Sequence, residues 1–111
     1  LIYKIINMKG IKFFYITCPK KKEANKIAAF LVKNKLVACA NIIHNVESIF
    51  SWKGKVTKTK EALIVGKTMN KKVQKIIKIV KKLHSYETPC IIFFDIKNGN
   101  TDFIKWIIKS V

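Results

Sequence analysis

The chain has 111 residues and a mass of 12.8 kDa, which is the size of one domain. Half of its residues are hydrophobic, so a core can form, while no apolar run approaches the ~18 residues of a membrane-spanning helix. The net charge is +17, and every basic residue is a lysine. Because proteins that read bases rely on arginine, nucleic-acid binding is not expected beyond nonspecific charge attraction.

The lysine excess has two interpretations. In one, it is a by-product of the biased composition that also enriches Ile, Asn and Phe. In the other, it is a surface that binds anions. The three cysteines, Cys18, Cys39 and Cys90, are widely spaced and form no C-x-x-C pair, which fits a reducing compartment. We expect the cytoplasm, or an organelle if the N-terminus is processed.

The first half of the chain predicts a strand, a helix and a second strand. Residues 1–10 show no period and are interpreted as an N-terminal extension, followed by a single domain over 11–111. The apolar run 11–17 predicts a buried strand. The following helix presents one apolar stripe, formed by Ala24, Ile27, Ala28 and Leu31. Residues 37–52 then predict one long or bulged strand.

The second half completes a hairpin and adds two helices and a strand. The turn Lys53-Gly54-Lys55 leads into a partner strand over 56–68. Asn70 is the predicted N-cap of the clearest helix, 70–84. A buried strand over 88–96 and a helix over 101–111, capped by Asn100 or Thr101, end the chain. This order predicts an α+β, ferredoxin-like βαββαβ sandwich with a long hairpin and a C-terminal helix.

Several familiar site types are not supported by the pattern. The segment V-G-K-T at 65–68 lacks the first glycine of a phosphate loop, because Glu61 stands there. The central strand carries no aromatic side chain on which an RNA base could stack. Cys39 lies between two alanines and has no neighbouring histidine to activate it, so no catalytic role is predicted.

The segment L-H-S-Y-E-T-P-C, 83–90, holds groups that suit a metal ion. Thiolate and imidazole would suit copper or zinc, with Cys39 and His84 as candidates. The alternative is that His84 ends a helix, where an imidazole is favourable near the C-terminal carbonyl groups. Composition alone favours the second interpretation.

Five segments of the chain resemble the CutA family of divalent-cation-tolerance proteins. They are LVACANII (36–43), SIFSWKGK (48–55), EALIVGKT (61–68), LHSYETPCII (83–92) and NGNTDFIKWI (98–107), in the order and at the spacing of that family. The resemblance covers about residues 11–110 and implies a tight homotrimer in which the hairpin pairs with neighbouring subunits. Trp52 and Trp106 then become interface residues.

The resemblance also implies copper or another divalent cation as the ligand, no catalytic activity, and Cys39 and His84 as metal ligands. Glu61, Lys67, Tyr86 and Glu87 are the residues of a possible cleft between subunits. Ser85 stands where the family usually has proline, which would loosen the corner, and Cys18 is given no metal role. A trimeric signalling or scaffold module that binds a small anion or a partner protein in such clefts is the alternative function.

Overall fold

The computed structural model describes residues 10–111, so the predicted N-terminal extension lies outside the described residues except for Gly10. The elements are β1 (Ile11–Cys18), α2 (Lys21–Lys33), β2 (Cys39–Trp52), β3 (Lys55–Met69), a short 3-10 helix η1 (Asn70–Lys72), α3 (Val73–Leu83), β4 (Ile91–Asp95) and α4 (Thr101–Ser110). Their order is the one predicted from sequence. Within this described part, no helix is both long enough and apolar enough to cross a membrane.

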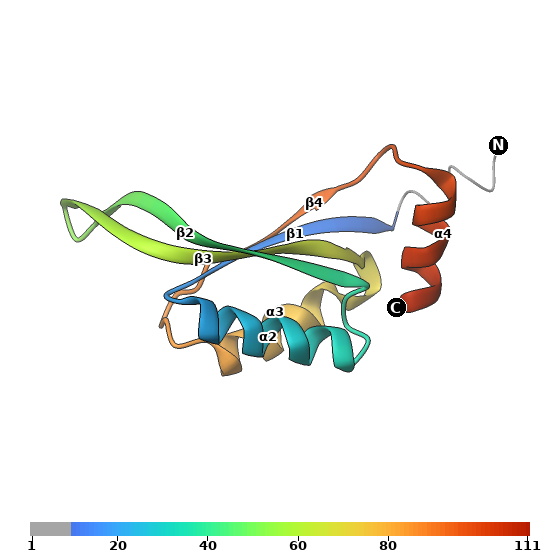
Figure 1. The fold of residues 1–111 in the computed structure, drawn as a ribbon, viewed down its shortest axis with the longest axis horizontal. Coiled ribbons are helices and arrows are strands. Elements are labelled where there is room, and N and C mark those ends of the chain that lie inside the picture. Colours follow the sequence, from blue (N-terminus) through green and yellow to red (C-terminus); the bar gives the residue numbers. More distant parts are fainter. Residues whose placement is uncertain (1–9) are drawn as a thin grey trace.

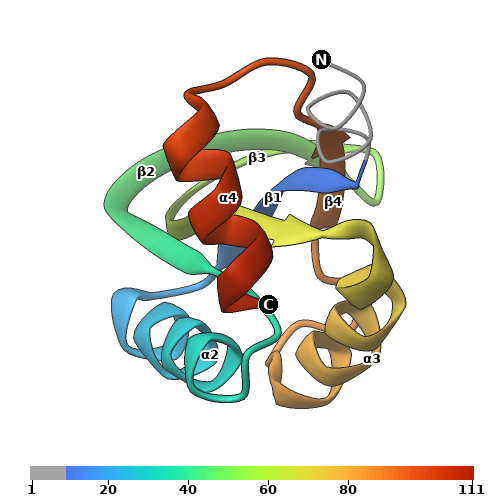
Figure 2. The same cartoon turned by 90° about the vertical axis from the view of Figure 1, so that its right-hand side faces the viewer.

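The four strands form one antiparallel sheet in the order β2-β3-β1-β4, which is the ferredoxin-like arrangement. Figure 1 shows α2 and α3 side by side beneath one face of this sheet, and Figure 2 shows the same two helices end on. We refer to the face that they cover as the closed face and to the opposite face as the open face. The fourth helix, α4, packs where β1 begins and contacts β1 and β3.

The main core lies between the closed face and the two helices. Side chains alternate between the faces of a strand, so every second residue of β1 and β3 joins this core. Its buried members are Phe14, Ile16, Cys18, Ala24, Ile27, Ala28, Leu31, Leu36, Val37, Ala62, Ile64, Ile76 and Val80. The predicted apolar stripe of α2 is therefore confirmed, whereas α3 contributes only Ile76 and Val80 as fully buried residues.

Gly66 allows two parts of this core to come close together. A Cβ atom at this position would lie 2.2 Å from the carbonyl oxygen of Cys39 and 2.5 Å from the ring of Phe14. Any side chain there would push β2 or the Phe14 ring away. The glycine thus fixes how β2 packs over the core.

The hairpin of β2 and β3 projects from the body and accounts for the elongated shape, 50 × 26 × 23 Å (Figure 1). Its two-residue turn has positive φ at both central residues, 51° at Lys53 and 78° at Gly54. This is the turn geometry that matches the twist of paired strands, and it confirms the predicted tight turn. A bulge between Ile43 and Val46, with φ 61° at Asn45, interrupts the pairing of β2.

Two predicted boundaries differ from the structure. Asn70 does not cap α3: its N–H donates to the carbonyl of Gly10 at 2.6 Å and it begins η1, so α3 starts only at Val73. The strand predicted over 88–96 is limited to 91–95, because Pro89 has no N–H for a ladder. The other helix cap is as predicted: the side chain of Asn100 accepts from the N–H of Asp102 at 2.9 Å.

Candidate metal-binding site

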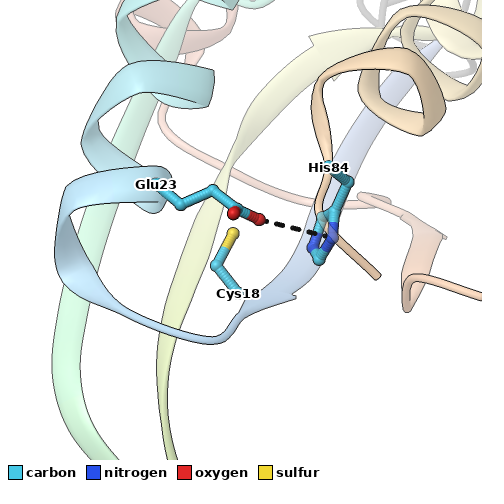
Figure 3. Close-up of side chains that lie close together, drawn as sticks. All are labelled: Cys18, Glu23 and His84. Atoms are coloured by element: carbon cyan, nitrogen blue, oxygen red, sulfur yellow. Dashed lines mark ion pairs between the residues drawn. The ribbon is translucent and has the colours of Figure 1, made fainter. Parts of the chain in front are cut away.

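Three side chains from three different elements meet at one edge of the helix layer. Cys18 ends β1, Glu23 lies in the first turn of α2, and His84 follows the last residue of α3. One sulfur, oxygen or nitrogen atom from each lies within 4.8 Å of the others (Figure 3). Cys18 is fully buried, and His84 is 8% exposed. The fold thus gathers a thiol, a carboxylate and an imidazole in a nearly solvent-free position.

Both ring nitrogens of His84 are engaged. Nε2 lies 2.6 Å from the carbonyl oxygen of Thr17, which can only accept, so Nε2 carries the proton. Nδ1 accepts from the backbone N–H of Tyr86 at 3.0 Å, and it lies 3.4 Å from a carboxylate oxygen of Glu23. With Nε2 as the donor and Nδ1 as the acceptor, these hydrogen bonds assign the Nε2–H tautomer.

Glu23 ties the start of α2 to the chain that follows α3. Its carboxylate accepts from the backbone N–H of Ser85 at 3.1 Å. A proline at position 85 could not donate this hydrogen bond. Ser85 was expected to loosen this corner, but its N–H adds a hydrogen bond to Glu23 that a proline could not make.

A second carboxylate stands beside the cluster. Glu61 of β3 is only 8% exposed, and it accepts a hydrogen bond of 2.7 Å from the hydroxyl of Tyr86. The ring of Tyr86 lies 5.0 Å from that of His84. Burial, followed by this hydrogen bond and the charge of Glu61, raises the pKa of Tyr86. Tyr86 consequently stays a neutral phenol that donates to the carboxylate.

The thiol of Cys18 is held in its protonated form. Burial, and then the negative charges of Glu23 and Glu61, raise the pKa of Cys18 from 9.0 to about 12. A thiol of this kind is a poor nucleophile. The same two carboxylates attract a cation, so a bound metal ion would replace the thiol proton.

Cys39, the other predicted ligand, lies elsewhere. It pairs with Lys67 on β3, whereas its neighbours Ala40 and Ile42 pack against the main core. Because side chains alternate, Cys39 is on the open face, while His84 belongs to the helix layer of the closed face. The structure does not bring Cys39 and His84 together within one chain.

The remaining predicted residues divide between the two faces. Glu61 and Tyr86 adjoin the cluster, as described. Lys67 lies near the first turn of α4: its Nζ is 3.4 Å from Oδ1 of Asn41 and 5.8 Å from the centre of the Phe103 ring. Glu87 is exposed and lines a small open pocket beside α3. The predicted cleft residues therefore do not form one group within a single chain.

Trp52 and Trp106, the predicted interface residues, are both accessible in the single chain. Trp52 ends β2 beside the hairpin turn and is 56% exposed. Trp106 of α4 is 45% exposed, and its ring stacks on that of Phe103 with centroids 5.4 Å apart.

Sequence reasoning missed two members of the cluster, Cys18 and Glu23. The available signal was local: a cysteine that ends a strand, followed five residues later by the sole glutamate of the next helix. Such a glutamate stands in the first helical turn, close to the end of the strand. The position of His84 beside them depends on how α3 packs, which no local pattern specifies.

Comparison with known proteins gives consistent matches along nearly the whole chain. The model of the CutA1 divalent ion tolerance protein family matches residues 12–110. A divalent-cation tolerance protein CutA from Archaeoglobus fulgidus is 40% identical over 99 residues, which are 89% of this chain and 96% of that protein. A CutA homolog from Xenopus laevis is 40% identical over 93 residues, 84% of this chain but only 62% of the relative. The chain thus spans less than two thirds of that longer protein.

Solved structures give the same result. The crystal structure of CutA1 from Oryza sativa has a TM-score of 0.89 at 32% identity, covering 94% of this chain and 95% of that one. The CutA1 structure from Ehrlichia chaffeensis has a TM-score of 0.86 at 38% identity, covering 93% and 96%. With the family model matched over 12–110 and the fold shared, this chain belongs to the CutA1 divalent ion tolerance protein family.

Proposed function

We propose that this protein is a homotrimer that weakly binds copper or another divalent cation and acts in metal homeostasis, in the cytoplasm or in an organelle. The observation that carries the proposal is the group of Cys18, Glu23 and His84, whose ligand atoms lie within 4.8 Å of one another. The family's name, divalent ion tolerance, supports the same class of ligand.

The donor set fits copper or zinc. Imidazole nitrogen, thiolate sulfur and a carboxylate oxygen are ligands of both ions, and a tetrahedral site with three protein ligands leaves one open position. In this proposal Nδ1 of His84, the carboxylate of Glu23 and the sulfur of Cys18 hold the ion. No catalytic step is assigned to it.

The same contacts explain why binding should be weak. An ion at Nδ1 of His84 must displace the N–H of Tyr86, which donates to that nitrogen at 3.0 Å. It must also displace the proton of Cys18, whose pKa is about 12. Both events cost free energy, so the observed affinity is lower than the ligand set alone would give.

The trimer is proposed from the exposed apolar surface of the single chain. Nine of the large exposed hydrophobic residues lie on the strands and α4: Ile43, Ile49, Phe50, Trp52, Val56, Ile92, Phe94, Phe103 and Trp106. Apolar surface of this extent usually marks an interface, and the edge strand β2 has unpaired backbone groups to cover. Copies of this chain that pair through the hairpin and the open face would bury both.

Calorimetric titration with Zn(II) tests the metal site. Cys18→Ser should lower the affinity at least about tenfold, since loss of a ligand costs more than loss of an outer hydrogen bond. The matched control is Cys39→Ser, a half-buried cysteine on the open face, for which we expect no change. Equal affinity in wild type and Cys18→Ser, with a loss of affinity in Cys39→Ser, would identify Cys39 as the metal ligand instead.

The alternative function, binding of a small anion or a partner protein between subunits, is favoured by one observation. Lys67 lies among Asn41, Phe103 and Cys39 on the open face, next to the surface proposed for subunit contact. Thermal-shift measurements with phosphate and nucleotides test it, with Lys67→Gln as the variant. Stabilisation that disappears in Lys67→Gln supports the alternative, and no shift with any anion at physiological salt rejects it.

A further inference from the structure

The positive charge of this protein is concentrated on the helix layer. Residues 20–35 and 70–83, which form α2, η1, α3 and their ends, contain twelve lysines against the single acid Glu23. They therefore carry +11 of the chain's net +17. Glu23 does not offset this charge at the surface, because its carboxylate is turned inward to His84 and Ser85.

The lysines form one row on each helix. On α2, Lys22, Lys26 and Lys33 follow a spacing of four and seven residues, and all three are exposed. At about 100° per residue, this row is diametrically opposite the buried stripe of Ala24, Ile27, Ala28 and Leu31. The row therefore points away from the sheet.

The second helix repeats this arrangement. On α3, the exposed Lys75, Lys78 and Lys82 lie three and four residues apart, opposite the buried Ile76 and Val80. Because α2 and α3 lie side by side on the closed face, the two rows share one outward surface (Figures 1 and 2). We refer to these six lysines as the lysine face.

We propose that the lysine face binds duplex nucleic acid through the phosphate backbone, without reading its sequence. Packed helices are about 8–10 Å apart and the major groove of DNA is about 12 Å wide, so the spacing of the two lysine rows is comparable to that of the phosphate rows that border a groove. Lysine provides point charges without the bidentate geometry that base recognition uses. We therefore expect the attraction for nucleic acid to be strongest at the lysine face.

An anionic membrane is the competing partner, and the fold favours it less. Helices that bind the membrane surface insert an apolar face between the lipids. Here the apolar stripes of α2 and α3 are buried against the sheet, and Phe30 and Val32 are the large apolar side chains that these two helices expose, so little besides charge would remain for a bilayer. Nucleic acid presents a much higher density of negative charge and binds through charge alone.

The test is fluorescence anisotropy of a labelled DNA duplex of about 20 base pairs and arbitrary sequence, with metal chelated, between about 50 and 200 mM salt. The variant replaces Lys26, Lys75, Lys78 and Lys82 by Gln, which keeps helix propensity. The matched control replaces the exposed Lys55, Lys97, Lys105 and Lys109 by Gln, so both variants lose the same charge. Circular dichroism and thermal unfolding confirm that each folds.

We expect wild type to bind with a log–log salt slope of about −5, as six phosphate contacts would give. The lysine-face variant should bind at least about tenfold more weakly at about 100 mM salt, with its slope reduced by about 3–4. The control should stay within about twofold of wild type. Equal losses in both variants would assign the binding to overall charge and overturn the proposal.

The remaining outcomes also overturn it. Absence of duplex binding by wild type at about 100 mM salt is one of them. Another is lysine-face-dependent binding to vesicles with about 30% anionic lipid when the duplex is not bound, which would identify a membrane surface instead. None of these outcomes bears on the metal site, because metal is chelated throughout.

Discussion

Two cysteines of this chain lie in opposite surroundings. Cys18 is fully buried on the closed face, beside Glu23, Glu61 and His84, and its pKa is raised to about 12. Cys39 is half-buried on the open face, and it pairs with Lys67. The sheet between them separates a buried cluster with two carboxylates from a surface with a lysine. The face of the sheet on which each cysteine lies, and not its position in a motif, therefore decides its chemistry.

The largest expected difference is in thiol reactivity. At pH 8 a thiol with a pKa of about 12 is only about one ten-thousandth thiolate, and Cys18 is also buried. Iodoacetamide should therefore label Cys18 about a thousandfold more slowly than an ordinary exposed thiol, and much more slowly than Cys39. Peptide mass mapping of a labelling time course measures both sites in one sample. Comparable rates would show that the cluster opens readily.

The two histidines should contribute very differently to the free energy of unfolding. His84→Ala should lower the free energy of unfolding by about 2–4 kcal/mol, because it leaves the N–H of Tyr86 and the carbonyl of Thr17 without partners. His44, exposed at the bulge of β2, is the control: His44→Ala should change it by less than about 0.5 kcal/mol. Urea unfolding measures both. Similar small effects would mean that the hydrogen bonds of His84 add little.

Alkaline pH should lower the free energy of unfolding through Cys18, on the closed face. The pKa of Cys18 is raised on folding, so the folded protein keeps a proton that the unfolded chain releases. The stability due to this thiol is present below pH 9.0 and is lost as pH rises toward about 12. Unfolding followed from neutral to alkaline pH should show a flatter decline in Cys18→Ser than in Cys39→Ser. Parallel curves for the two variants would contradict the assignment.

The smallest effect concerns the charge of Glu23. Glu23→Gln keeps an oxygen that accepts from Ser85 but removes one of the negative charges that raise the pKa of Cys18. The pKa of Cys18 should therefore fall, while the free energy of unfolding changes by less than about 1 kcal/mol. Thiolate absorbance during a pH titration measures the shift. Glu47→Gln, which removes an exposed carboxylate near Lys58, should leave it unchanged.

Most of the fold could be predicted because its signals are local. The period of the apolar residues places α2 and α3, and the two-residue turn at Lys53-Gly54 sets the hairpin. The strand order follows from the sequence of elements. Asn70 was misassigned because the backbone contact that occupies it comes from Gly10, sixty residues away in the chain.

The metal-binding cluster could be predicted only in part, because its members come from three elements. His84 was identified from its motif. Cys18 was not, and the pairing of Cys39 with His84 came from the resemblance to the CutA family. The strand itself does not show which face of β2 meets the core, because it carries apolar residues at both Ile42 and Ile43. Only the packing of the helices shows which of these residues points inward.

In the proposed metal site, a divalent cation binds at Cys18 rather than at Cys39. Titration with Co(II), followed by the absorption band of a thiolate bound to cobalt, tests it directly, because the band reports the coordinating sulfur itself. We predict the band in wild type and in Cys39→Ser, and its loss in Cys18→Ser. A band that persists in Cys18→Ser and disappears in Cys39→Ser would contradict the claim.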